Sequence, residues 1–221
     1  MIPPGHDADF VAAMEDVLDL YQQPYDRRAP VVCMDETSRQ LVGEVSRPLP
    51  PARRRPARSD YEYERKGTAN VFLFTEPLRG WRWASATEHR TRRDWAHAVR
   101  TLLDVHYPKA RVVRLVMDNL NVHAIGSLYE AFEPAEARRL AARLEIHHTP
   151  IHGSWLNIAE IELRVLSQQC LARRIPALDQ MQREIDAWEK PRNESSVGVT
   201  WRFTAPDARI RLRHLYPQME A

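Results

Sequence analysis

The chain has 221 residues, 43% apolar and 28% charged, with a formal net charge of +2, which fits one large domain with its own core. Its two cysteines, Cys33 and Cys170, are too few for a disulfide scaffold or a four-thiolate zinc site. No apolar run approaches the ~18 residues of a membrane span, and no secretory signal is evident, so we expect a cytoplasmic protein without membrane partners.

The first 45 residues predict a helix followed by a strand. Residues 1–26 contain six acids and no Lys or Arg. Apolar residues recur at helical spacing over 8–22, and Pro24 ends that helix. The apolar run 30–36 predicts a buried strand with Asp35 and Glu36 at its end.

A basic, proline-rich segment comes next. Residues 46–59 contain four prolines and five arginines, which is incompatible with a central strand and predicts a loop or arm. Arginine suits bidentate phosphate contacts. The arginines that are candidates for gripping DNA or a partner subunit are Arg53, Arg54, Arg55 and Arg58. A solvated loop is the alternative, and GC-rich coding would also enrich arginine.

The middle of the chain predicts a hairpin, a helix and a second buried strand. Residues 67–77 and 81–87 read as two strands joined by a turn. A helix begins at Thr91, with Asp94 placed as in a capping box, and Pro108 stops it. The apolar run 111–119 then ends in an acid, Asp118, as the first predicted strand does.

The last part predicts mostly helices around one more strand. We expect helices over 124–132 and 134–144, a strand over 144–150, a helix capped by Ser154 and extending to about 172, and another over 177–190. The remainder is poorly patterned. Strands linked by a hairpin and then alternating with helices indicate an α/β mixed sheet covered by helices.

Two apolar strands that each end in aspartate suggest a metal site. One such Asp most often caps a turn, but Asp35 and Asp118 in one sheet would repel unless a cation neutralised them. Hard oxygen ligands select Mg²⁺ or Mn²⁺. The third carboxylate is Glu160 or Glu162. The helical wheel mildly favours Glu160, which lies at the polar edge of the helix, whereas Glu162 lies within the apolar arc.

Three sequence blocks resemble the catalytic blocks of the DDE endonucleases, specifically bacterial insertion-sequence transposases of the mariner superfamily. The blocks are VVCMDETSRQL, VMDNLNVH and TPIHGSWLNIAEIELRVLSQQCL. The resemblance covers roughly residues 8–216. It implies a ribonuclease-H-like mixed sheet flanked by helices, with Asp35, Asp118 and Glu160 as catalytic, metal-binding residues.

The resemblance also implies the chemistry and the partners. It implies two-metal phosphoryl transfer with two Mg²⁺ or Mn²⁺ ions, double-stranded DNA as substrate and target, and a homodimer associated with the nucleoid. The side chains expected to orient the ligands or the substrate are Asn119, Asn121, His123 and Asn157. His152 and Trp155 are further candidates for DNA contact. We expect a linker helix in 1–28, the catalytic domain in 29–190 and a tail in 191–221.

The chain departs from that family in one respect that keeps other functions open. Such transposases carry an N-terminal DNA-reading region, so we expect a separate segment to supply it or the chain to be a truncated relic. The alternatives are a catalytically inactive remnant that binds DNA or a partner, and a ribonuclease-H-like nuclease acting on RNA–DNA hybrids. Zinc binding by His147, His148 and His152 is not favoured, since no helix or cysteine supports it.

Overall fold

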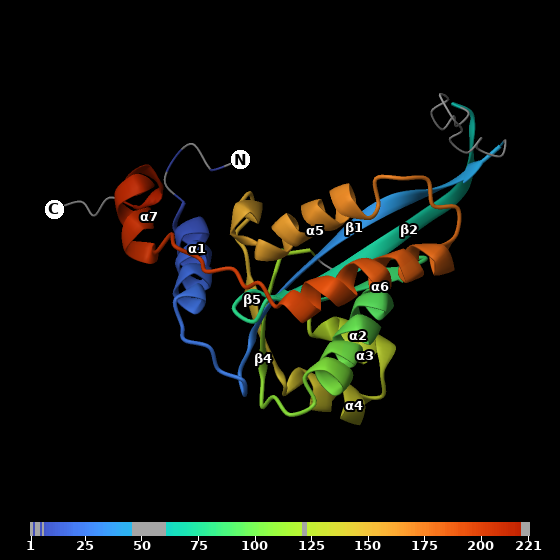
Figure 1. The fold of residues 1–221 in the computed structure, drawn as a ribbon. Coiled ribbons are helices and arrows are strands. Elements are labelled where there is room, and N and C mark those ends of the chain that lie inside the picture. Colours follow the sequence, from blue (N-terminus) through green and yellow to red (C-terminus); the bar gives the residue numbers. More distant parts are fainter. Residues whose placement is uncertain (1, 3–4, 6, 46–60, 121–122, 218–221) are drawn as a thin grey trace.

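The computed structural model describes residues 2, 5, 7–45, 61–120 and 123–217, and a five-stranded mixed sheet forms its centre (Figure 1). The strand order is β3-β2-β1-β4-β5. The strands are β1 (Val31–Glu44), β2 (Tyr63–Glu76), β3 (Trp81–Thr87), β4 (Val113–Met117) and β5 (Leu144–His148). The first three form an antiparallel meander, while β4 and β5 continue the sheet parallel to β1. The predicted mixed sheet is confirmed.

The first strand is longer than its sequence pattern indicates. We predicted a strand over 30–36, but β1 continues to Glu44 and pairs with β2 along its length. Residues 61–68 of the partner segment are all exposed, whereas Leu41 and Gly43 of β1 are buried, so the outer part of this hairpin is a two-stranded ribbon that is only partly covered. Such a ribbon needs no alternation of apolar and polar residues, and the pattern that marks a half-buried strand is therefore missing.

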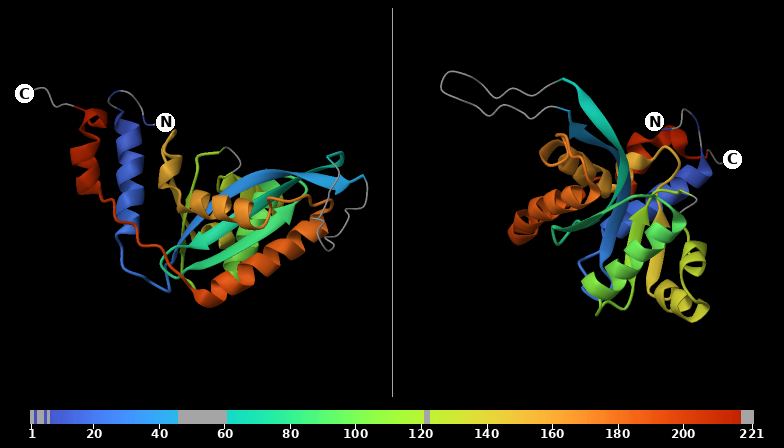
Figure 2. Two further views of the ribbon diagram at one scale, coloured as in Figure 1. Left: turned by 45° about the horizontal axis from the view of Figure 1, so that its top comes forward. Right: turned by 90° about the vertical axis from the view of Figure 1, so that its right-hand side faces the viewer.

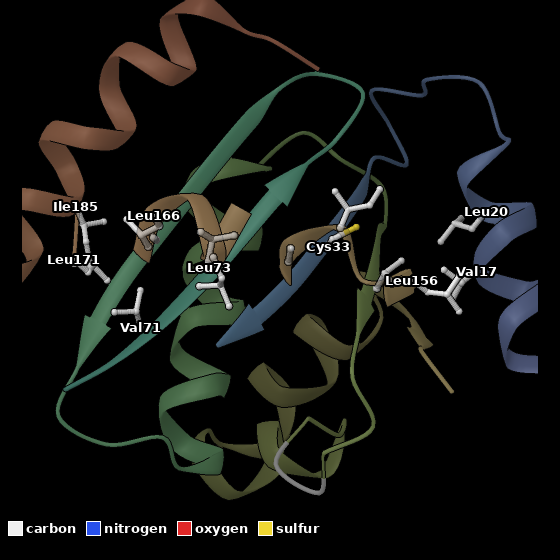
Figure 3. Close-up of a cluster of buried hydrophobic side chains, with 14 of the residues drawn as sticks. Val17, Leu20, Cys33, Val71, Leu73, Leu156, Leu166, Leu171 and Ile185 are labelled. Carbon is white, nitrogen blue, oxygen red and sulfur yellow. The ribbon is translucent and has the colours of Figure 1, made fainter. Parts of the chain in front are cut away.

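Helices cover both faces of the sheet. The helices are α1 (Ala8–Tyr21), α2 (Arg92–Thr101) with a π-helical extension (Leu102–His106), α3 (Gly126–Ala131), α4 (Pro134–Ala141), α5 (Ile158–Gln169), α6 (Leu178–Ser195) and α7 (Ala205–Arg211). On one face, apolar side chains of β1 and β2 pack against α2, α3 and α4. On the other they pack against α1, α5, α6 and α7, in a cluster that includes Cys33, Leu73, Leu166 and Ile185 (Figure 3).

Two helix boundaries differ from expectation for identifiable reasons. Asn157, not Ser154, caps α5, because residues 154–156 form a separate 3₁₀ turn and the Asn157 side chain accepts the Ala159 N–H. Helix α6 also continues through Pro191, where we predicted an end at 190. Proline removes one helical hydrogen bond, and Arg192 and Asn193, which follow it, bond to Glu162 and to the Arg82 carbonyl.

The predicted C-terminal tail contains α7, which packs against α1 (Figure 2). A capping box formed by Thr204 and Asp207 begins this short helix. Arg209 pairs with Glu15 at 2.7 Å, and the Tyr216 hydroxyl donates to the same carboxylate. Because α1 and α7 share the core of one sheet face, the expected linker helix is part of that core in this structure.

Side chains of α6 bond to the main chain of the edge strand β3. Gln182 accepts from Ala86 N–H and donates to Ala84 C=O, Glu189 accepts from Ala84 N–H, and Asn193 bonds both main-chain groups of Arg82. These distances lie between 2.7 and 3.2 Å. A helix thereby occupies the place of a sixth strand and protects the edge from pairing with another chain.

Glu189 gives this contact a dependence on pH. Burial raises the pKa of Glu189 to about 7, although the hydrogen bond from Ala84 opposes the shift. The pKa of this carboxyl is higher in the folded protein than in the unfolded chain. The folded protein is therefore destabilised as the pH rises from the unfolded pKa toward 7. We expect Glu189→Gln to be about 1 kcal/mol more stable than the unchanged protein at pH 8, after discounting for partial exposure. The difference should shrink toward zero at pH 4.5.

Urea unfolding at several pH values measures this difference. Glu194→Gln, an exposed position on the same helix, is the matched control and should show no such trend. A Glu189→Gln protein less stable than the unchanged one at pH 8 would contradict the prediction.

No helix among the described residues has the length and apolar character required to cross a bilayer.

Candidate active site

Neighbouring parallel strands bring two of the expected carboxylates together. The pairing of β1 with β4 aligns Cys33 with Val116. Asp35 and Asp118 each follow two residues later, so they emerge side by side where β4 ends. Carboxyl ends of parallel strands are where α/β sheets form their sites.

The start of α5 brings the third carboxylate to the same place. Asn157 caps this helix and donates through its side-chain amide to the Met34 carbonyl at 2.9 Å. That bond ties the first turn of α5 to the strand residue preceding Asp35. Glu160 lies in this first turn and is exposed. Asn157 itself is 2% exposed, so its role in this structure is to join helix and strand.

The pKa of Asp35 shows that other carboxylates lie near it. Burial is the largest cause that raises the pKa of Asp35, to about 7, and the charges of Glu36, Asp118 and Glu160 raise it further. A hydrogen bond from Glu36 N–H, 2.8 Å long, opposes the shift. Mutual repulsion of this kind indicates a place that a cation would stabilise.

Glu162, the other candidate for the third carboxylate, lies in a different environment. It is 7% exposed and pairs with the almost fully buried Arg82 at 3.1 Å, and with Arg192 of α6 at 3.3 Å. Both arginines join α5 to the β3–α6 side of the molecule. Glu162 is also absent from the charges that act on Asp35. Of the two glutamates, Glu160 is the one whose charge acts on Asp35 in this structure.

A buried network extends from Asp118 to the other face of β1. His123 Nδ1 lies 2.7 Å from Asp118 Oδ1, and His123 Nε2 lies 3.1 Å from Glu36 Oε2. Neither Nε2 of His123 nor Oε2 of Glu36 has a hydrogen-bond partner among the described residues, so the second contact is an ion pair. Arg90 approaches Glu36 Oε1 at 3.4 Å. Burial lowers the pKa of His123, but its contacts with the two carboxylates and their charges outweigh it and raise the pKa to about 9.

Sequence reasoning gave Glu36 no role, although a signal existed. Strand alternation places Glu36 on the side of Met34, which is fully buried. A glutamate on a buried face requires a partner, and the side chain of this one is 1% exposed. The partner could not be identified from the pattern, because His123 and Arg90 come from distant loops.

The remaining candidates are dispersed. Asn119 is exposed and borders a hollow of about 390 Å³ between the start of α1 and the loop after β5. His152 is exposed, with a positive φ of 68°. Trp155 packs against Trp201 and Phe203, with ring centroids 6.4 and 5.8 Å away. The other expected residues lie outside the described ones: Asn121, Arg53, Arg54, Arg55 and Arg58.

The donor set fits a hard divalent cation better than zinc. Asp35, Asp118 and Glu160 offer carboxylate oxygens, which Mg²⁺ and Mn²⁺ prefer. Among the described residues, the side chains whose ligand atoms lie within 4.8 Å of one another are Glu36, Asp118 and His123. His147 instead pairs with Asp16 and Glu145, at 2.7 and 3.1 Å.

Comparison with solved structures identifies the fold. The chain is similar to the catalytic domain of Mos1 mariner transposase, with a TM-score of 0.55 and 12% identity over 89% of this chain and 96% of that one. The Mos1 strand transfer complex gives a TM-score of 0.56 and 13% identity over 82% of this chain. The Mos1 paired end complex with Mn gives 0.56 and 13% over 89%. The chain spans 53% and 60% of the length of those two proteins.

The fold expected from the sequence is thus confirmed as that of this catalytic domain, with its ribonuclease-H-like sheet. None of the curated proteins compared with the chain matches it significantly. Residues 30–182, which include all three carboxylates, match the family described as DDE superfamily endonuclease. That stretch covers more than half of the sequence, and the chain therefore belongs to the DDE superfamily endonucleases.

Proposed function

We propose that this chain is the catalytic domain of a DDE transposase that cleaves DNA at the ends of a mobile element and joins those ends to a target. The convergence of Asp35, Asp118 and Glu160 on one edge of the sheet carries the proposal. The similar Mos1 structures are a strand transfer complex and a paired end complex, which supports the same kind of substrate.

The three carboxylates would hold two Mg²⁺ or Mn²⁺ ions. Bound there, such ions would supply Lewis-acid chemistry, which could activate an attacking oxygen and stabilise a leaving oxygen at phosphorus. Asp35 and Asp118 provide ligands from rigid neighbouring strands. Glu160 provides one from a helix that Asn157 fixes to β1. Rigid elements hold such ligands more accurately than loops do.

Other parts of the chain would contact DNA or another copy of the protein. We assign DNA backbone contacts to the arginine-rich stretch 46–59 and to His152 and Trp155 near the start of α5. We also propose a homodimer and a catalytic domain over residues 29–190, on which α1 and α7 pack. Backbone contacts by arginine would make DNA binding depend on salt without conferring sequence preference.

A nicking assay on supercoiled plasmid tests the proposed function. The protein should convert supercoiled to open-circular DNA with Mn²⁺ or Mg²⁺ and should not do so in EDTA. Asp118→Ala should lose this conversion while keeping its circular dichroism spectrum, because it removes one ligand from a site at the end of a strand. An RNA–DNA hybrid serves as the competing substrate.

Each outcome discriminates between functions. Faster cleavage of the hybrid than of plasmid would favour a ribonuclease-H-like activity. Equal nicking by the unchanged protein and by Asp118→Ala would indicate a contaminating nuclease. Failure of the folded, metal-loaded protein to nick, even with an added DNA-reading region, would favour a remnant without turnover.

A further inference from the structure

Asp118 is contacted by His123, a side chain whose own orientation is fixed by its surroundings. His123 contacts one oxygen of Asp118, Oδ1, at 2.7 Å, and its ring is 1% exposed. The ring lies beside the fully buried Trp95 of α2, with ring centroids 6.1 Å apart. A buried ring with a bonded nitrogen has little freedom to rotate, so the orientation of His123 fixes one oxygen of Asp118.

The other nitrogen of this histidine faces Glu36, whose side chain is also almost fully enclosed. The Glu36 side chain is 1% exposed, and its two oxygens are divided between two partners. Oε2 lies 3.1 Å from His123 Nε2, and Oε1 lies 3.4 Å from Arg90 Nη1. Both oxygens of Glu36 thus face a positively charged partner, and Glu36 belongs to the compact group Glu36, Asp118 and His123.

We infer that Glu36 is a positioning residue for the metal site: supported by Arg90, it orients His123 and through His123 the Asp118 carboxylate. This inference rests on the proposed function, since it assumes that Asp118 is a metal ligand. Glu36 comes from the same strand as Asp35 but from the opposite face. One strand thus supplies a ligand on one face and the support for a second ligand on the other.

The alternative is that Glu36 simply fills space or neutralises Arg90. A carboxylate that only neutralised Arg90 could lie at the surface, because 46% of the Arg90 side chain is exposed. Burial of a charged group is costly unless its partners compensate for it. Contact with a histidine bonded to a ligand gives the buried position a role that packing alone does not.

Calorimetric titration of the full chain with Mn²⁺ tests this inference apart from catalysis. Glu36→Gln keeps the shape of the side chain and one acceptor oxygen, but removes the charge. We expect it to weaken Mn²⁺ binding about 10-fold, the lower end of what supporting partners of metal ligands contribute. In the nicking assay, the half-saturating Mn²⁺ concentration should rise by a similar factor. The rate at saturating Mn²⁺ should stay within about 3-fold, since binding restores the orientation of Asp118.

A double-variant cycle separates positioning from an independent effect. If Glu36 acts through His123, Glu36→Gln should have little further effect once His123→Ala is present. Glu162→Gln is the matched control, because Glu162 is also a buried carboxylate paired with arginine but does not contact the aspartates. Its Mn²⁺ affinity should lie within 2-fold of that of the unchanged protein, provided that circular dichroism shows both variants to be folded.

The outcomes distinguish this inference from the proposed function. Unchanged Mn²⁺ affinity in folded Glu36→Gln, or additive losses in the double variant, would overturn the positioning role and leave the metal site intact. If the unchanged protein and Asp118→Ala bind Mn²⁺ equally, or neither binds it, the proposed metal site is wrong and the positioning role fails with it.

Discussion

Asp35→Asn is expected to reduce metal-dependent nicking by at least about 1,000-fold while making the metal-free protein more stable. The loss follows because bound divalent ions supply several kcal/mol of transition-state stabilisation, and about 4 kcal/mol corresponds to a factor near 1,000. The gain follows because Asn removes a charge that burial and three neighbouring carboxylates oppose. Asn also keeps an oxygen to accept the Glu36 N–H.

Thermal unfolding in EDTA and in Mn²⁺ measures both halves of this prediction. In EDTA, Asp35→Asn should be about 1–2 kcal/mol more stable than the unchanged protein. Mn²⁺ should stabilise the unchanged protein and leave the variant unaffected, because only the former binds the ion. Asp179→Asn, an exposed aspartate paired with Arg183, should change neither property. If Asp35→Asn is less stable than the unchanged protein in EDTA, or if it still nicks DNA, the carboxylates do not form a mutually repulsive cation site.

The second large effect is expected at Glu162, and it concerns stability. Glu162→Ala leaves Arg82, which is 3% exposed, without its closest carboxylate, and also removes a partner of Arg192. Breaking a buried pair on one side costs about 3–5 kcal/mol, because the remaining charge is uncompensated. Chemical unfolding should report a loss of this size. Nicking at low temperature, where the variant is folded, should stay within a few-fold.

Two comparisons make the Glu162 prediction specific. Glu160→Ala should behave in the opposite way, with an unfolding free energy close to that of the unchanged protein and no nicking. The double variant Arg82→Met with Glu162→Leu should recover most of the stability, since apolar side chains of similar volume often replace buried ion pairs without loss. If Glu162→Ala is stable but inactive while Glu160→Ala nicks, the third ligand is Glu162.

The parts of the fold that the sequence predicted are those with a strong local pattern. The apolar runs before Asp35 and Asp118 indicated two buried strands, and the Thr91–Asp94 capping box marked the start of α2. The placement of Glu160 was also accessible, because helical periodicity separates an exposed first-turn glutamate from Glu162 in the apolar arc. Local patterns of this kind arise from burial of one face of an element.

The parts that the sequence did not predict depend on contacts between distant segments. The partners of Glu36 are 54 residues away at Arg90, and still farther away at His123. No periodicity links such positions, so only the folded chain reveals them. The same applies to α6, which continues through Pro191 and beyond it bonds to β3 and to Glu162. Helix propensity alone ends this helix too early.

The pairing of α6 with the main chain of β3 has a consequence for newly synthesised chains. The side chains that complete this edge lie 96 to 111 residues after the groups they bond. At a translation rate of ~5–20 residues per second, roughly 5–20 s pass between the synthesis of β3 and the synthesis of the α6 side chains that bond to it. During that interval the main-chain groups at the edge of β3 are unpaired and can meet other nascent chains on the same messenger RNA. Unpaired strand edges promote pairing between chains. Yield in the cell is therefore expected to depend on translation speed between β3 and α6.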